Sequence, residues 1–241
     1  MTGAAQGLGR MACSYLARHG ATIVALDRHS IDGTLEEISG IGSPNLGVRA
    51  DVSKLPEVEA AAEEAVREYG RIDVLINGAA LFTTLKHSSF MDIDPDEWDR
   101  VFQVNTKSVF LCARAVAPQM ISQGSGSIIN IGSNVVSYGM ANFLHYVASK
   151  SAIVGMSRSL ARELGPHRVR VNTVSPGFVT TEITGKRPEE YRKGVIATQA
   201  ITEAILPEDI AAVLAFLSSD ASRMVTGQDW LINGGSHMGP A

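Results

Sequence analysis

Cysteine and aromatic residues are scarce in this chain, which contains 2 cysteines among 241 residues and 6% aromatic residues. Cys13 and Cys112 cannot form a disulfide framework for a fold of this size. The cytoplasm, which keeps thiols reduced, is therefore the expected compartment. The sequence also begins without a charged segment followed by an apolar one, so no signal peptide is predicted.

The chain also lacks an excess of positive charge. Its formal net charge is −4, which argues against nucleic acid or an anionic membrane as a partner. No charged residue lies between Arg114 and Lys150. Pro118 and several glycines and asparagines interrupt this stretch, whereas a membrane-spanning helix needs about 20 mostly apolar residues. The stretch therefore predicts buried backbone that lines a cavity.

Apolar sequence is abundant, at 45% of the residues, and is sufficient for one large core. We find no repeat or linker and interpret residues 1–241 as a single domain. Short, nearly continuous apolar runs, typical of buried parallel strands, alternate with helical patterns. The expected strands are 22–26, 46–50, 72–76, 127–131 and 169–174, and the expected helices are 8–19, 55–69, 96–120, 146–164 and 207–217. This alternation predicts an α/β fold: a doubly wound parallel sheet of Rossmann type with helices on both faces.

A glycine-rich turn, TGAAQGLG, occupies residues 2–9 ahead of the first expected helix. Its glycines permit a tight turn and close approach of the backbone to a pyrophosphate, which the amides at the helix start would bind. Turns of this kind also begin ordinary helices, so this motif alone leaves both interpretations open. The strand that should precede the turn is missing from the sequence. We expect either further residues upstream or another segment in its place, and favour a missing or misassigned start.

Asp27 follows the next expected strand, 18 residues after Gly9. An acidic residue about 20 residues beyond such a turn contacts the adenosine ribose in dinucleotide-binding folds. Its carboxylate would accept hydrogen bonds from a 2′-hydroxyl and repel a 2′-phosphate, so NAD is favoured over NADP. Arg28 could pair with that phosphate instead, and a solvated Asp-Arg turn is the alternative without function.

Tyr146 and Lys150 are four residues apart in an expected helix, so they share one face. A free phenol with a pKa near 10 is a poor base, and a nearby cation that lowers its pKa by about 3 units supplies roughly 4 kcal/mol. Ser133 follows the strand 127–131, at the end of the sheet where ligands bind, and its hydroxyl could donate to a substrate oxygen. Taken alone, Tyr146 and Lys150 could be an ordinary surface pair and Ser133 an ordinary loop serine. Their combination predicts a catalytic site.

With these motifs in place, the chain resembles the classical short-chain dehydrogenase/reductase family over residues 2 to about 235. TGAAQGLG is similar to the family's T-G-x-x-x-G-x-G turn, NGAA at 77–80 to its N-N-A-G segment, and PGFVTT at 176–181 to its P-G-x-x-x-T segment. The resemblance implies that Asp51 and Val52 contact the adenine ring and that Thr181 meets the nicotinamide carboxamide. The expected cofactor-binding residues are Gly3, Gln6, Gly7, Leu8, Gly9, Asp27, Arg28, Asp51, Val52, Asn77, Ala79, Tyr146, Lys150, Pro176, Gly177, Val179 and Thr181.

The resemblance also assigns catalytic roles. It implies that Tyr146 is the general acid and base, that Lys150 lowers its pKa and holds the nicotinamide ribose, and that Ser133 orients the reacting oxygen. Asn105 matches the family's helix asparagine, which holds a helix kink and a water in a proton relay. One departure is Gly78, which replaces the second asparagine of N-N-A-G. No metal is implied, and relatives commonly form homotetramers through the two long helices.

The expected pocket wall is mostly apolar and comprises Leu81, Phe82, Val135, Tyr138, Phe143 and Phe178. No arginine or lysine in these segments could bind a carboxylate or phosphate, and Lys86 is the nearest candidate. Residues 184–203, charged and weakly patterned, are expected to form a mobile lid over the pocket. The leading hypothesis is therefore an NAD(H)-dependent oxidoreductase that acts on an uncharged, fairly hydrophobic secondary alcohol or ketone.

Two alternatives remain open. One is a reductase of 3-oxoacyl groups carried as thioesters on an acidic carrier protein. This function needs a basic docking patch beside the pocket, for which the candidates are Arg158, Arg162, Arg168 and Arg170. The other alternative is a dinucleotide-binding scaffold without catalysis, against which Ser133, Tyr146 and Lys150 argue.

Overall fold

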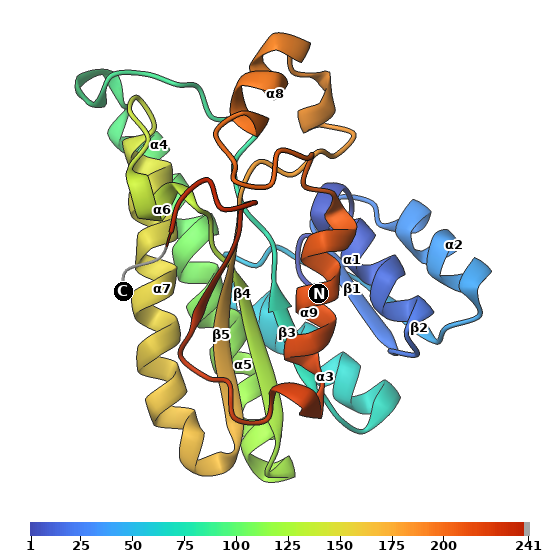
Figure 1. The fold of residues 1–241 in the computed structure, drawn as a ribbon. Coiled ribbons are helices and arrows are strands. Elements are labelled where there is room, and N and C mark those ends of the chain that lie inside the picture. The colour runs from blue at the N-terminus through green and yellow to red at the C-terminus, as the bar shows by residue number, and fades with distance from the viewer. Residues whose placement is uncertain (239–241) are drawn as a thin grey trace.

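A parallel sheet forms the centre of the protein in the computed structural model, which describes residues 1–238 (Figure 1). Its strands are β1 (Ile23–Asp27), β2 (Asn45–Arg49), β3 (Val74–Asn77), β4 (Gly126–Ile131), β5 (Val169–Pro176) and β6 (Asp229–Ile232). All their pairings are parallel, β1 with β2 and then β3 to β6 in sequence order. The five strands expected from the sequence are confirmed, with boundaries shifted by at most two residues.

The position between β1 and β3, where the strand before the glycine turn was expected, is taken by the first two residues. Thr2 forms parallel bridges with Leu26 on one side and Asn77 on the other. The Met1 amino group donates to the Val24 carbonyl at 2.9 Å, and the Thr2 amide donates to the Ile76 carbonyl at 3.0 Å. These two residues therefore join β1–β2 to β3–β6 and lead directly into the turn.

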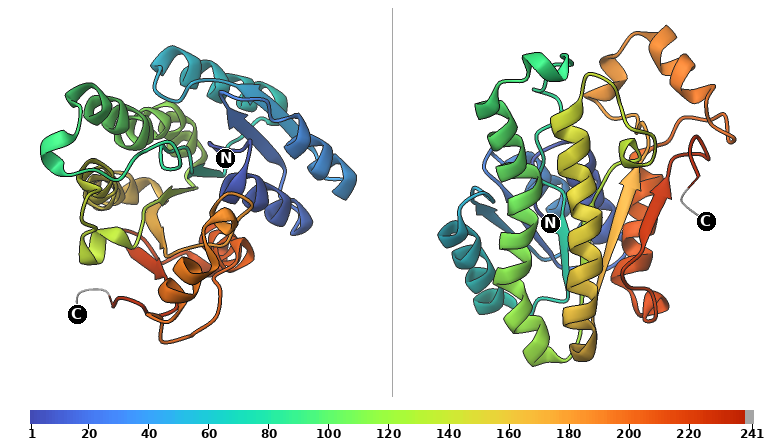
Figure 2. Two further views of the ribbon diagram at one scale, coloured as in Figure 1. Left: turned by 90° about the horizontal axis from the view of Figure 1, so that it is seen from above. Right: turned by 90° about the vertical axis from the view of Figure 1, so that its left-hand side faces the viewer.

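Helices cover both faces of the sheet, as the strand pattern predicts (Figure 2). The helices α1 (Gly7–Arg18), α2 (Asp32–Ile41) and α9 (Pro207–Ser218) pack into one core cluster with Ile76 and Ile129. The helices α3 (Leu55–Tyr69), α5 (Ser108–Gln123) and α7 (Leu144–Leu164) pack into a second with Leu75 and Ile128. Because neighbouring residues of a strand face opposite sides, both must be apolar when both faces are covered.

The long helix expected over 96–120 is divided in the structure. It begins as α4 (Pro95–Phe102), passes through a π-helical turn over Gln103–Lys107 and continues as α5. The turn inserts one extra residue without interrupting the helical dihedral angles, so no breaking residue marks it in the sequence. The structure also contains elements that the sequence analysis did not predict: α2, α6 (Val135–Tyr138), α8 (Glu189–Ile196) and β6.

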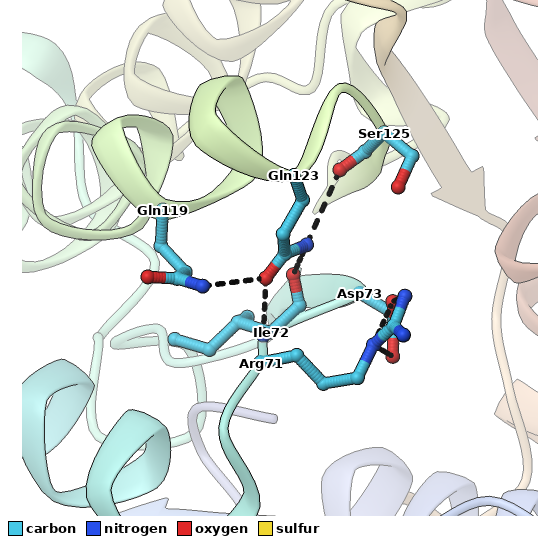
Figure 3. A network of polar contacts seen from close by, with 6 residues as sticks. All are labelled: Arg71, Ile72, Asp73, Gln119, Gln123 and Ser125. Atoms are coloured by element: carbon cyan, nitrogen blue, oxygen red, sulfur yellow. Dashed lines mark hydrogen bonds and ion pairs between the residues drawn. The ribbon is translucent and has the colours of Figure 1, made fainter.

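The carboxyl end of α5 fixes the amino end of β3 through one glutamine (Figure 3). The Gln123 side-chain oxygen accepts from the Ile72 amide and its nitrogen donates to the Ile72 carbonyl, both at 2.9 Å. Gln119 adds a donor to the same oxygen at 3.0 Å, and Arg71 pairs with Asp73 at 2.7 Å. Since β3 leads at its other end into the cavity described below, this anchor sets the position of that strand.

The uncharged stretch between Arg114 and Lys150 runs from α5 through β4 and α6 into α7. Within it Ile128 and Ile129 are fully buried, and the segment from Ile131 to Val135 lines a large cavity. Buried backbone beside a cavity was the prediction for this stretch, and it is confirmed. Among residues 1–238, no helix combines the length and apolar character needed to cross a membrane.

Candidate active site

A cavity of about 450 Å³ opens at the carboxyl ends of the parallel strands, the position where open α/β sheets bind ligands. Its wall includes the ends of β1 and β4, the loops after β3 and β5, and the first turn of α1. Of the catalytic and cofactor-binding residues expected from the sequence, all line this cavity except Asn77 and Asn105. The fold therefore brings together segments that are far apart in the chain, from Gly3 to Val195.

The glycine turn fits a cradle for a pyrophosphate. Gly3 has φ +72°, and a Cβ there would lie 2.8 Å from the Ala79 amide nitrogen. A Cβ on Gly9 would overlap the Gly3 carbonyl oxygen. Gly7, the first residue of α1, has φ +55°. The backbone can therefore take this shape only with glycine at these positions, and it directs the amides and positive end of α1 to the cavity.

We expect Gly9→Ala to abolish dinucleotide binding or raise its Kd more than tenfold, because the added methyl group must displace the Gly3 carbonyl. Isothermal titration calorimetry with NADH measures this effect. The matched control is Gly40→Ala in α2, where a Cβ meets no atom within 4 Å; alanine there should leave Kd unchanged and, as a better helix former, stabilise by up to about 1 kcal/mol. Equal affinity for both variants would contradict the proposed cradle.

Asp27 lies at one end of the cavity, at the end of β1. One carboxylate oxygen accepts from the Ala5 amide at 3.1 Å and the other from the His29 amide at 2.9 Å. The side chain thus holds the glycine turn and the loop after β1 together, and each oxygen keeps capacity for a second donor. Arg28, Asp51 and Val52 line the same end, so these four residues lie together as the resemblance implied.

Tyr146 and Lys150 project from the first turns of α7 beside Ser133, which follows β4. The Lys150 ammonium donates to the Ile131 carbonyl at 2.7 Å and lies 5.9 Å from the centre of the Tyr146 ring. Ser133, Tyr146 and Lys150 are all buried, at 8%, 7% and 3% exposure. This catalytic cluster, Ser133 with Tyr146 and Lys150, can exchange a proton with a bound oxygen while bulk water is largely excluded.

The pKa of the phenol differs from the sequence-based expectation. Burial raises the pKa of Tyr146 to about 12, an effect that the Ser133 hydroxyl only partly offsets. Burial also lowers the pKa of Lys150 to about 8. Loss of hydration is the largest effect on the phenol, so its pKa in the protein alone lies above its ordinary value, opposite to the lowering expected from Lys150. At neutral pH the phenol is protonated and ready to donate a proton.

Asn105 and Asn77 lie behind the cavity wall rather than in it. Asn105, fully buried in the π-helical turn, accepts from the Leu81 amide at 2.7 Å and donates to the Leu81 carbonyl at 3.1 Å and to Ser149 at 3.2 Å. It therefore positions the loop after β3, which lines the cavity, against α7. Asn77 donates to Asn130 at 2.9 Å inside the sheet. Asn77 does not line the cavity, whereas its neighbour Ala79 does, and its role in cofactor binding stays a prediction.

The loop after β5 closes the cavity from the other side. Pro176, Gly177, Val179 and Thr181 line it, as expected. Glu182 follows, and its carboxylate accepts from the Gly7 amide at 2.8 Å, on the first residue of α1. The expected lid over 184–203 is built from a 3₁₀ turn over Thr184–Lys186 and from α8. The segment is thus largely helical, and Thr184, Tyr191 and Val195 from these two elements line the cavity; its role as a lid stays a prediction.

Several cavity residues were not found from the sequence. They include His87 and Met140 from loops and Arg187, Tyr191 and Val195 from the lid. No motif marks them, because loops and a short helix carry no periodic pattern that fixes which residues face inward. The stacking of His87 on Phe143, with ring centres 4.4 Å apart, depends on a contact across 56 residues of sequence.

A glycine cradle at the start of α1 and a tyrosine–lysine pair at the far end of one cavity define an oxidoreductase that uses a nicotinamide dinucleotide. Comparisons with known proteins identify the family. Residues 3–237 match the family described as Enoyl-(Acyl carrier protein) reductase. The chain belongs to the short-chain dehydrogenase/reductase family.

Similar proteins cover nearly the whole chain. The 3-oxoacyl-(acyl-carrier-protein) reductase of Thermotoga maritima is 36% identical over 98% of this chain and 95% of its own length. The reductase of the same name from Staphylococcus aureus is 34% identical over 99% and 97%. A crystal structure of a short-chain type dehydrogenase/reductase from Mycobacterium marinum superposes with a TM-score of 0.89, at 32% identity, over 98% of this chain and 93% of that one. A structure described as a short-chain alcohol dehydrogenase from Sinorhizobium meliloti gives 0.91 at 28% identity, over 98% and 94%.

Proposed function

We propose that this protein reduces the 3-oxo group of an acyl thioester with a nicotinamide dinucleotide. The observation that carries the proposal is the burial of Ser133, Tyr146 and Lys150 at the wall of one cavity that also contains the glycine cradle. Two relatives named as 3-oxoacyl-(acyl-carrier-protein) reductases, at 36% and 34% identity, favour this substrate over a simple secondary alcohol.

In this proposal the dinucleotide supplies the hydride, and the protein positions and protonates the oxygen. Ser133 donates a hydrogen bond to the carbonyl oxygen, and Tyr146 donates the proton that the developing alkoxide needs. A buried phenol whose pKa is raised to about 12 is protonated at neutral pH and can therefore donate this proton. Lys150 supplies positive charge beside it and would reach the nicotinamide ribose. Asn105 positions the loop after β3.

An uncharged, hydrophobic ketone or secondary alcohol remains the second candidate function. Phe82, Phe143 and Phe178 line the cavity, and the rings of Phe82 and Phe143 lie 5.3 and 4.8 Å from that of Tyr146. This aromatic wall fits an apolar substituent on either class of substrate. The two candidate functions differ in the length of the apolar substituent that the substrate carries.

Three of the four arginines expected to form a basic docking patch beside the pocket, Arg162, Arg168 and Arg170, lie towards the opposite end of the sheet from the cavity. Arg168 and Arg170 lie at the amino end of β5, whereas the cavity is at its carboxyl end. Arg170 donates to the Leu217 and Ser219 carbonyls at the end of α9, at 2.8 and 3.2 Å. Arg162 is twelve residues after Lys150 on α7, or about 18 Å along the helix.

Kinetics with matched substrates test the proposed function. We expect acetoacetyl-N-acetylcysteamine to be reduced with a kcat/KM at least tenfold above that of 2-butanone or cyclohexanone, measured by the absorbance of the reduced dinucleotide. The reverse order would establish the ketone reductase instead. Dinucleotide binding with no turnover of any of them would favour the non-catalytic scaffold.

We propose that NAD(H) is preferred over NADP(H), because the Asp27 carboxylate would face the 2′ position. We expect Asp27→Asn, which keeps an acceptor oxygen and removes the charge, to lower the ratio of kcat/KM for NADH to that for NADPH at least tenfold, since a like-charge contact costs several kcal/mol. Asp92→Asn, in the 3₁₀ turn Phe90–Asp92, is the control. An unchanged ratio would assign the selection to Arg28 or to other residues.

We further propose that the chain works in the cytoplasm as a homotetramer assembled through α5 and α7. Phe110 and Leu144, one on each helix, are both 46% exposed and would be covered if α5 and α7 packed against a second copy. Light scattering coupled to size exclusion should give four times the mass of 25.6 kDa. Phe110→Glu should lower that mass, whereas a monomeric wild-type protein would contradict the proposal.

A further inference from the structure

Arg187, a charged side chain at the lid end of the cavity, has no role in the proposed reaction. The charged residues that line the cavity are Asp27, Arg28, Asp51, Lys150 and Arg187. The first three lie with β1 and β2 at the end assigned to adenosine, and Lys150 belongs to the catalytic cluster. Arg187 follows the 3₁₀ turn Thr184–Lys186 and is exposed, so it adds a positive charge where the sequence analysis expected an uncharged wall.

A column of stacked rings leads away from the phenol of Tyr146 along the wall of the cavity that Arg187 also lines. Phe143 stacks on Tyr146 with ring centres 4.8 Å apart, and His87 stacks on Phe143 at 4.4 Å with an angle of 4° between the planes. Burial, and then the charge of Arg187, lower the pKa of His87. Arg187 and His87 both line the cavity, and the lowered pKa leaves His87 neutral at neutral pH.

The carboxylates near Arg187 in the sequence pair with other groups, so its guanidinium is available to bind a ligand. Glu182 accepts from the Gly7 amide at 2.8 Å, and Glu189 pairs with Lys193 at 2.7 Å. Within residues 1–238 no carboxylate lies within 4.0 Å of the Arg187 guanidinium, which instead lies 5.9 Å from the centre of the Tyr191 ring. A planar guanidinium held against an aromatic ring keeps its donors directed outward for a carboxylate or phosphate.

We propose that Arg187 determines substrate specificity by binding an anionic group that the substrate carries several bonds from its reacting carbonyl. This inference rests on the proposed function and deepens it. The cavity would hold the carbonyl at Tyr146 and the apolar part of the substrate against Phe143 and Phe82, with the anion at the lid. The anionic group has two candidate sources. It is either a phosphate on the thiol side of the thioester or a carboxylate at the far end of the acyl chain.

Three substrates and three variants test this role. The neutral reference is acetoacetyl-N-acetylcysteamine, acetoacetyl-coenzyme A adds phosphates on the thiol side, and the N-acetylcysteamine thioester of 3-oxoadipate adds a carboxylate on the acyl side. We expect Arg187→Gln to raise KM at least tenfold for one anionic substrate, because a charge-assisted hydrogen bond is lost. KM for the neutral reference should change less than twofold. The affected substrate identifies the source of the anion.

Arg187→Lys should recover part of the loss, since it keeps the charge without the bidentate geometry. Lys186→Gln is the control for lost surface charge, because Lys186 is exposed and does not line the cavity; its KM values should stay within twofold of those of the wild type. Equal changes for all three substrates with Arg187→Gln, or no change for any, would overturn the inference.

A failure of the proposed function is distinguishable from a failure of this inference. If the wild-type protein reduces none of the three substrates, the function is wrong. The inference is then decided by calorimetry with coenzyme A and with adipate monoethyl ester in the presence of NAD. Binding that weakens tenfold or more in Arg187→Gln but not in Lys186→Gln supports an anion site; equal binding by the wild type and both variants rejects it.

Discussion

Tyr146→Phe is expected to lower kcat by a factor of about 10² to 10⁴, the usual contribution of a positioned general acid. The substitution removes only the phenolic hydroxyl, and the ring keeps its packing against Phe82 and Phe143. The Kd for NADH should stay within threefold of the wild-type value, because the glycine cradle and Asp27 are untouched. Single-turnover reduction of acetoacetyl-N-acetylcysteamine, with calorimetry for the dinucleotide, measures the two effects separately.

Tyr15→Phe provides the matched control. Tyr15 lies on α1, stacked on His19 with ring centres 4.3 Å apart, and does not line the cavity. It should keep full activity. If Tyr146→Phe retains more than a tenth of the wild-type kcat, the phenol is not the proton donor, and the assignment of the catalytic cluster fails.

Lys150→Met is expected to abolish turnover and yet stabilise the fold at neutral pH. Burial lowers the pKa of Lys150 from 10.5 to about 8, a shift that corresponds to about 3 kcal/mol of destabilisation when the amine is charged. The variant also loses the hydrogen bond to the Ile131 carbonyl. This loss destabilises it by about 1 kcal/mol and offsets part of the gain. The net gain in the free energy of unfolding at pH 7 is therefore about 2 kcal/mol, and methionine fills most of the space of the lysine stem.

The pH dependence of this gain has a definite sign. Between the folded-state pKa of about 8 and the reference value of 10.5, the unfolded chain binds more protons than the folded one, so the stability of the wild-type protein rises with pH. The difference between Lys150→Met and the wild type should thus be largest below pH 8 and shrink towards pH 10.5. Urea denaturation at several pH values measures it. Lys86→Met, at an exposed position, is the control, and a variant less stable than the wild type at pH 7 would contradict this account.

The parts of the fold that the sequence predicted are those with a strong local signal. Strands buried on both faces must be apolar throughout, and this made β3, β4 and β5 recognisable. Elements without such a pattern were missed: α2 contains Gly33 and Gly40, and β6 has four residues beginning with Asp229. Periodicity alone did not divide the helix over 96–120, because a π-helical turn uses ordinary residues; only the resemblance implied a kink at Asn105, which lies in that turn.

The candidate site also contains residues that could be predicted from the sequence and residues that could not. The glycine turn, Asp27, Ser133 and the pair Tyr146 and Lys150 could be predicted because their chemistry demands particular residue types at particular distances along the chain. The pKa of Tyr146 could not, since it depends on how completely the fold removes water from the phenol. Nor could Arg187, whose place at the cavity is set by the path of the lid.

The hydrogen bond between the Gly7 amide and Glu182 bears on how a dinucleotide enters. The positive end of α1 already holds a carboxylate, so a pyrophosphate would arrive by anion exchange and not by displacing solvent alone. The measured affinity for a dinucleotide is then the difference between two binding free energies at the same amides, that of the pyrophosphate and that of the Glu182 carboxylate. On that basis Glu182→Gln, which weakens the resident competitor, should tighten the binding of NADH and slow its release.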